Sequence, residues 1–99
     1  MKRLLATALA ALAVAGAAQA EGPSKLVTVL TAPEPQTQLM AMVLTMQAAQ
    51  QGVAPHILLC GPAGDLALKD APESATAGQP PRDMSPQGLM QMIMQQPGA

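Results

Sequence analysis

Two stretches of this chain show a clear period of apolar and polar positions. Residues 25–31 (KLVTVLT) are β-branched and almost continuously apolar, which predicts a strand covered on both faces. Residues 36–51 change to a helical period, with glutamines on the side opposite the apolar stripe. The stripe consists of Leu39, Met42, Val43, Met46 and Ala49. The loop between the two stretches contains two prolines, which exclude a continuous helix there.

A second strand is predicted at residues 56–59, after a short turn. Gly52 can take the left-handed conformation that ends a helix, so the first helix is expected to stop there. Strand, helix and strand joined by short loops form a βαβ unit, which predicts parallel strands and a right-handed crossover.

The second strand is followed by a turn and a further helix start. Cys60, Gly61 and Pro62 end the apolar run, so the cysteine is expected at the carboxyl end of a strand. Asp65 is predicted to cap a short helix over residues 66–69. Residues 70–84 are polar, rich in proline and glycine and without a period, which predicts a mobile loop.

A last helix is predicted after this loop. Ser85 and Pro86 form an N-cap and first-turn pair, and the helix is expected to end before Pro97. Its apolar face is predicted to comprise Leu89, Met92, Ile93 and Gln96. The order βαβα defines an α/β class with a parallel sheet flanked by helices. Two strands rarely make an independent sheet, so a further strand is expected beyond residue 99.

The first 20 residues have the composition of a secretory signal peptide. Lys2 and Arg3 precede an apolar, alanine-rich run, and residues 18–20 form an A-x-A cleavage site. A retained membrane anchor is the alternative, but the run is short and weakly apolar for a span of about 20 residues. The expected domains are therefore a signal peptide at 1–20 and an α/β domain at 21–99, located in the periplasm.

Charge and composition narrow the range of partners. After residue 20 there are three basic and six acidic side chains, so the formal charge is −3, and there are no aromatic rings. Nucleic acid is therefore not expected as a partner, because neither a basic surface nor a stacking platform is available.

Cys60 is the one cysteine, so an internal disulfide is impossible. An unpaired cysteine in an exported protein indicates a reactive thiol or an intermolecular bond. The alternative is a small buried hydrophobic residue, a common role for cysteine. Helical N–H groups after Gly61 would favour the thiolate, whereas Asp65 and Asp70 would oppose it.

Other candidate chemistry is weaker. His56 and Cys60 are about 13 Å apart along a strand at 3.3 Å per residue, too far for a Cys–His pair, so His56 is expected to be a strand-edge residue. The methionine pairs of both helices resemble Cu(I) ligands, but of Met90, Met92 and Met94 only the first and last share a helix face. Core packing is the favoured role of the methionines, and no metal site is assigned.

Motifs for cofactor and hydrolase chemistry are absent from the sequence. Residues 61–64 (GPAG) match neither a Walker loop nor a GxGxxG turn, and no Ser/His/Asp set or paired catalytic carboxylates are visible. No cofactor is expected, and a conventional hydrolase is not supported.

With these elements placed, the chain resembles the DsrE/DsrF-like family, and more narrowly its exported members. The likeness covers most of residues 25–96, including the run LLCGPAGDLALK at 58–69 and the Ser85-Pro86 entry to the last helix. The resemblance implies a flavodoxin-like fold, homo- or hetero-oligomers and, in the best-known members, sulfur relay through a cysteine persulfide.

One feature of that family has no counterpart in this chain. The sulfur-carrying cysteine of its best-known members follows the strand after the last helix, which lies beyond residue 99. Three functions are therefore expected in order: sulfur or thiol handling through Cys60 with a donor or acceptor protein, a non-catalytic oligomer-forming scaffold, and a methionine-based Cu(I) binder. Sulfurtransferase-like activity is the only enzymatic class considered.

Overall fold

The computed structural model describes residues 24–99, so the predicted signal peptide lies outside the described residues. The elements follow the order β1 (Lys25–Leu30), α2 (Pro35–Gln50), β2 (Ala54–Leu59), the 3₁₀-helix η1 (Gly61–Ala67), α3 (Glu73–Thr76) and α4 (Pro86–Met94). This is an α/β arrangement with a two-stranded parallel sheet, as the sequence predicts. Among residues 24–99, no helix is long and apolar enough to span a membrane.

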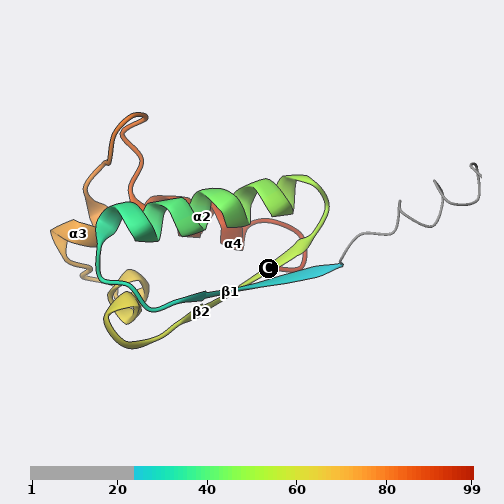
Figure 1. Ribbon diagram of the computed structural model, residues 1–99, viewed down its shortest axis with the longest axis horizontal. Coiled ribbons are helices and arrows are strands. Elements are labelled where there is room, and N and C mark those ends of the chain that lie inside the picture. Colours follow the sequence, from blue (N-terminus) through green and yellow to red (C-terminus); the bar gives the residue numbers. More distant parts are fainter. Residues whose placement is uncertain (1–23) are drawn as a thin grey trace, which may run out of the picture.

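Helices α2 and α4 lie side by side on the same face of the sheet (Figure 1). We call it the covered face, and its residues are Leu26, Thr28, Leu30, Pro55, Ile57 and Leu59. Strand side chains alternate between faces, so the residues between these lie on the opposite side. We call this the open face; it comprises Lys25, Val27, Val29, Ala54, His56 and Leu58.

The prediction that β1 is covered on both faces is wrong for the described residues. Val27 and Val29 are each 58% exposed and Leu58 is 53% exposed, whereas Leu30 on the covered face is 4% exposed. The sequence pattern could not reveal this difference, because β-branched and apolar residues occupy both alternating sets of β1 positions.

The core lies between the covered face and the two long helices. Met42 and Leu66 are fully buried, and Ile93 of α4 is 1% exposed. The predicted apolar face of α2 is confirmed at four of its five positions, with Val43 only partly buried. Gly52 has φ +90° directly after the C-cap, which confirms its predicted role in ending the helix.

Three local predictions need correction. The second strand begins at Ala54 rather than residue 56. The turn after Cys60 is itself helical, with Gly61 at φ +53° and Pro62 in the first turn. Helix η1 therefore starts five residues earlier than predicted, and Asp65 lies inside it rather than capping it. Segment 70–84 contains the one-turn helix α3, and its predicted mobility stays a prediction.

Helix α4 confirms its predicted start. The Ser85 hydroxyl accepts a hydrogen bond from the Gly88 N–H at 3.0 Å, and Pro86 occupies the first turn. Its buried face differs from the prediction, however. Met90 is 7% exposed and lies opposite β2, whereas Met92 is 51% exposed and borders an open groove beside α2.

Candidate functional site at the carboxyl edge of the sheet

The carboxyl ends of both strands lie at one edge of the sheet, because the strands are parallel and end in register at Leu30 and Leu59. Cys60 follows directly, and its backbone N–H donates to the Leu30 carbonyl at 2.9 Å. This extra bond continues the sheet by one residue and holds the cysteine in place. The predicted location of Cys60 at the end of a strand is confirmed.

The Cys60 side chain is neither sealed in the core nor fully exposed. Its backbone is extended and serves as the N-cap of η1, and its carbonyl accepts from the Ala63 N–H at 3.2 Å. Asp65 lies further along η1 and is exposed. The arrangement therefore presents a free, partly accessible thiol on a backbone that is fixed on both sides.

Gln38 lies in the first turn of α2, a few residues after the carboxyl end of β1. It was not among the residues that the sequence pattern indicated as functional. Its Nε2 donates to the carbonyl of Ala32, just after β1, at 2.8 Å. The side chain is 3% exposed, and its Oε1 has no hydrogen-bond donor among the described residues. Its position four residues before Met42 places it on the buried stripe, which is the one signal that could have revealed it.

A second polar contact joins α2 to the middle of the sheet. The hydroxyls of Thr28 and Thr45 are 2.6 Å apart, and the Thr45 hydroxyl also lies 2.8 Å from the Ala41 carbonyl. A hydroxyl has a single proton, so Thr45 donates to Ala41 and Thr28 must donate to Thr45. This pair fixes α2 over β1.

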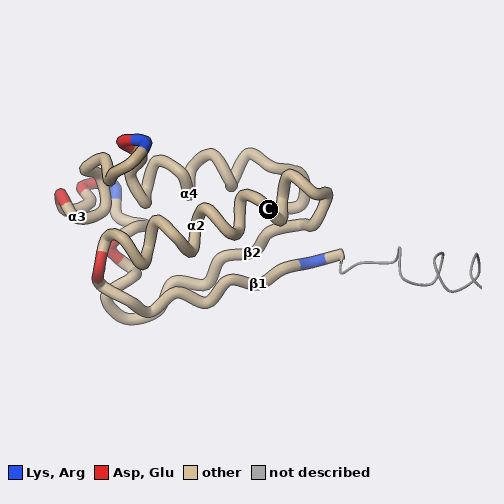
Figure 2. Tube along the Cα trace, turned by 45° about the horizontal axis from the view of Figure 1, so that its top comes forward, with Lys and Arg blue, Asp and Glu red and all other residues tan. Residues whose placement is uncertain are grey.

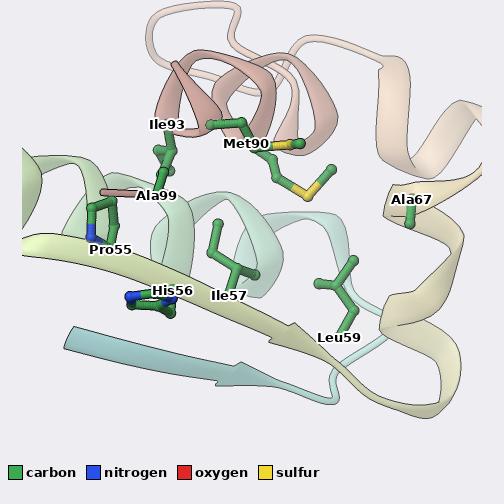
Figure 3. A pocket seen from close by; sticks show the side chains of 9 residues that line it. Pro55, His56, Ile57, Leu59, Ala67, Met90, Ile93 and Ala99 are labelled. Atoms are coloured by element: carbon green, nitrogen blue, oxygen red, sulfur yellow. The ribbon is translucent and has the colours of Figure 1, made fainter. Parts of the chain in front are cut away.

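His56 does not join Cys60 in a catalytic pair. It lies beside Val27 in the sheet, on the open face, and its side chain points away from α4 (Figure 3). Four residues of strand separate it from Cys60, a distance of about 13 Å. This placement agrees with the expectation that His56 and Cys60 do not form a Cys–His pair.

An apolar cavity of about 330 Å³ lies between β2 and α4 (Figure 3). Pro55, Ile57 and Leu59 point toward α4 from below, and Met90 and Ile93 face them from above. His56 is the polar side chain of this lining, and it points away from α4, while the side chains that face the cavity from β2 and α4 are apolar. A small-molecule site needs several convergent polar groups, so we assign this cavity as a packing gap at the edge of the core.

The structure separates most of the methionines. Met42 is fully buried in the core, whereas Met40 is 55% exposed on the same helix. Met90 and Met94 both border the cavity between β2 and α4 and a second cavity between η1 and α4. The Met90 side chain is buried, whereas that of Met94 is exposed. Between residues 24 and 99, no group of three His, Cys, Asp or Glu side chains could hold a metal ion.

Comparisons with family models, curated proteins and solved structures give no significant match to this chain. The structure and the chemistry of its residues are therefore the basis for any functional conclusion.

Proposed function

We propose that this chain is an exported, DsrE-like α/β protein that handles sulfur or thiols through Cys60 in the periplasm. The observation that supports the proposal is the position of the thiol, partly accessible at the carboxyl edge of the parallel sheet. Ligands and reactive groups of open α/β sheets collect at this edge. A cysteine with only a packing role would be expected in the core formed by Met42, Leu66 and Ile93.

The reaction would be the transfer of one sulfur atom from a polysulfide. The Cys60 thiolate attacks a sulfur atom of the polysulfide dianion, and a new S–S bond forms at Cys60. One S–S bond of the polysulfide breaks, and its electron pair leaves with the shortened polysulfide. Atoms and charges balance without an external oxidant, and a second thiolate can remove the terminal sulfur by the same chemistry.

The test is the intact mass of the purified protein before and after incubation with polysulfide. The proposal expects a gain of whole sulfur atoms that dithiothreitol reverses. Cys60→Ser is the matched control, since it replaces sulfur by oxygen at the same partly accessible position, and it should show no gain. A folded wild-type protein that gains no sulfur would overturn the proposal.

A non-catalytic scaffold subunit is the second candidate, and the open face favours it. Val27, Val29 and Leu58 leave an apolar surface beside the outer edge of β1, which has no partner strand within residues 24–99. This is expected of a subunit that assembles with another chain. An unreactive Cys60 in a protein that still self-associates would support this function over sulfur handling.

A further inference from the structure

The two outer edges of the sheet differ in their ability to pair with another strand. The N–H groups of Ala54 and Cys60 donate to carbonyls of Ser24 and Leu30, so the even-numbered N–H groups of β2 face β1. The outward positions of β2 are therefore 55, 57 and 59. The first of them is Pro55, which has no N–H to offer, and prolines at such positions protect edge strands.

The outer edge of β1 has no such protection. Its carbonyls at the even-numbered positions face β2, so the backbone groups of Lys25, Val27 and Val29 face outward. These three residues present three N–H and three C=O groups, and no proline interrupts them. Within residues 24–99, no backbone hydrogen bond outside β1 and β2 uses these groups.

We propose that β1 pairs with β1 of a second copy of this chain, antiparallel and centred on Val27, to form a four-stranded sheet. In this register Val27 faces Val27 of the second copy, and Lys25 faces Val29. All three outward residues then occupy hydrogen-bonded positions, so the pairing forms six backbone hydrogen bonds. The same patch serves both copies, as a twofold interface requires.

Charge favours the antiparallel orientation. Lys25 is at the amino end of β1, whereas the acidic residues of the described part of the chain lie toward the other end of the molecule (Figure 2). Antiparallel pairing brings each lysine alongside the acidic end of the other copy. It also separates the two lysines by four residues, or about 13 Å, so they do not repel each other at close range.

The position of helix α2 is also compatible with this pairing of the β1 strands. Helix α2 packs over both strands, so its axis is expected about half a strand spacing inside β1. Adding the partner strand at about 4.8 Å then places the two copies of α2 about 9 to 10 Å apart, within the normal range for packed helices. A side-by-side helix pair would therefore form without moving either helix.

The helix surface at that contact is suitable for close packing. Ala41 and Ala48 lie on the side of α2 opposite Val43, which borders α4. Leu44 is their neighbour on the helix surface and is 59% exposed. Two small residues allow close approach, and the leucine adds apolar area at the rim.

The size of this contact predicts a weak dimer. The contact surface is the side of the molecule formed by the outer edge of β1 and the adjoining side of α2. Helix α2 has 16 residues, so this surface is about 24 Å long, and the sheet and helix layers together make it about 15 to 20 Å high. Its area is on the order of 400 Å² per copy, half that of a typical stable interface. Dimerisation should therefore depend on protein concentration in the micromolar range.

The experiment is sedimentation velocity of the purified protein from low to high micromolar concentration under reducing conditions. We expect a monomer–dimer equilibrium that Cys60→Ser leaves unchanged, which separates this proposal from the proposed sulfur chemistry. Val29→Pro removes an outward N–H and should weaken the dimer at least about tenfold, whereas Val29→Ala retains the N–H and should remain dimeric.

A second pair of variants avoids any change in the strand. Leu44→Lys alters a side chain that is already exposed, so the monomer should remain folded while the dimer weakens about tenfold. Met94→Lys is the matched control, because Met94 is 66% exposed on α4, away from the proposed contact. In hydrogen exchange, the Val27 and Val29 amides should become protected with rising concentration, while those of Ile57 and Leu59 should not.

Two results would overturn the proposal. One is a wild-type protein that stays monomeric over the whole concentration range. The other is a dimer that persists in Leu44→Lys and leaves the Val27 and Val29 amides unprotected, since this dimer would use another surface.

Discussion

The two faces of the sheet contain similar residues but have very different surroundings. Leu30 and Ile57 pack beneath α2 and α4, whereas Val29 and Leu58, their neighbours in the chain, remain more than half exposed. Both faces would support a core if a second layer covered them, since both are apolar. The comparison shows that hydrophobicity by itself does not identify the face that stabilises the monomer. The elements packed on a face determine its contribution.

Replacing a residue of α4 that packs over the covered face should have the largest effect on the free energy of unfolding. Ile93→Ala is expected to lower the free energy of unfolding by about 2 to 5 kcal/mol, because it removes buried methyl and methylene groups and enlarges the cavity beside them. Urea unfolding measures the change. Met92→Ala, at an exposed position on the same helix, should shift the value by no more than about 0.5 kcal/mol. Equal losses in the two variants would contradict the assigned core.

Breaking the polar contact across the covered face should have the next largest effect. Thr45→Val leaves the Thr28 hydroxyl without its acceptor and should cost about 1 to 3 kcal/mol. Thr28→Val should cost less, because Thr45 keeps its bond to the Ala41 carbonyl. Urea unfolding of both single variants and the double variant gives the coupling energy. Additive losses would show that the two hydroxyls do not interact.

A smaller effect on stability is expected at Gln38, because its Nε2 makes a hydrogen bond while its Oε1 is buried without one. Gln38→Met removes the bond to the Ala32 carbonyl but also removes a buried oxygen without a donor. The two terms oppose each other, so stability should change by less than about 1 kcal/mol. Gln38→Glu is the contrasting variant and should cost more, because it buries a carboxylate and loses the donor. A loss above about 2 kcal/mol in Gln38→Met would indicate that the oxygen has a partner.

The smallest effect is expected on the open face. Leu58→Thr should change the unfolding free energy of the monomer by no more than about 0.5 kcal/mol, because Leu58 is 53% exposed. Ile57→Thr, one residue earlier on the covered face, should cost about 1.5 kcal/mol through lost apolar contacts and a partly buried hydroxyl. Thermal or urea unfolding at low protein concentration makes the measurement. A large loss at Leu58 would mean that another segment covers the open face.

Much of the candidate site could be predicted from local sequence. The position of Cys60 follows from an apolar run that stops at glycine and proline, and the Ser85 cap follows from its pairing with Pro86. Gln38 and the Thr28–Thr45 contact could not be predicted in the same way. Their polar side chains are buried only because α2 packs on β1. No pattern of neighbouring residues in the sequence predicts that contact.

The sequence by itself determined the elements of this protein, because periodicity, caps and turn residues act over a few neighbouring residues. It determined the two strands, the long helix ended by Gly52, and the capped final helix. Only the tertiary structure decided that both long helices lie on one face and that Met90 rather than Met92 is buried. It also decided that no other strand of residues 24–99 pairs with the outer edge of β1. These outcomes depend on which elements compete for the same surface, and alternating apolar residues on both faces of β1 cannot encode that choice.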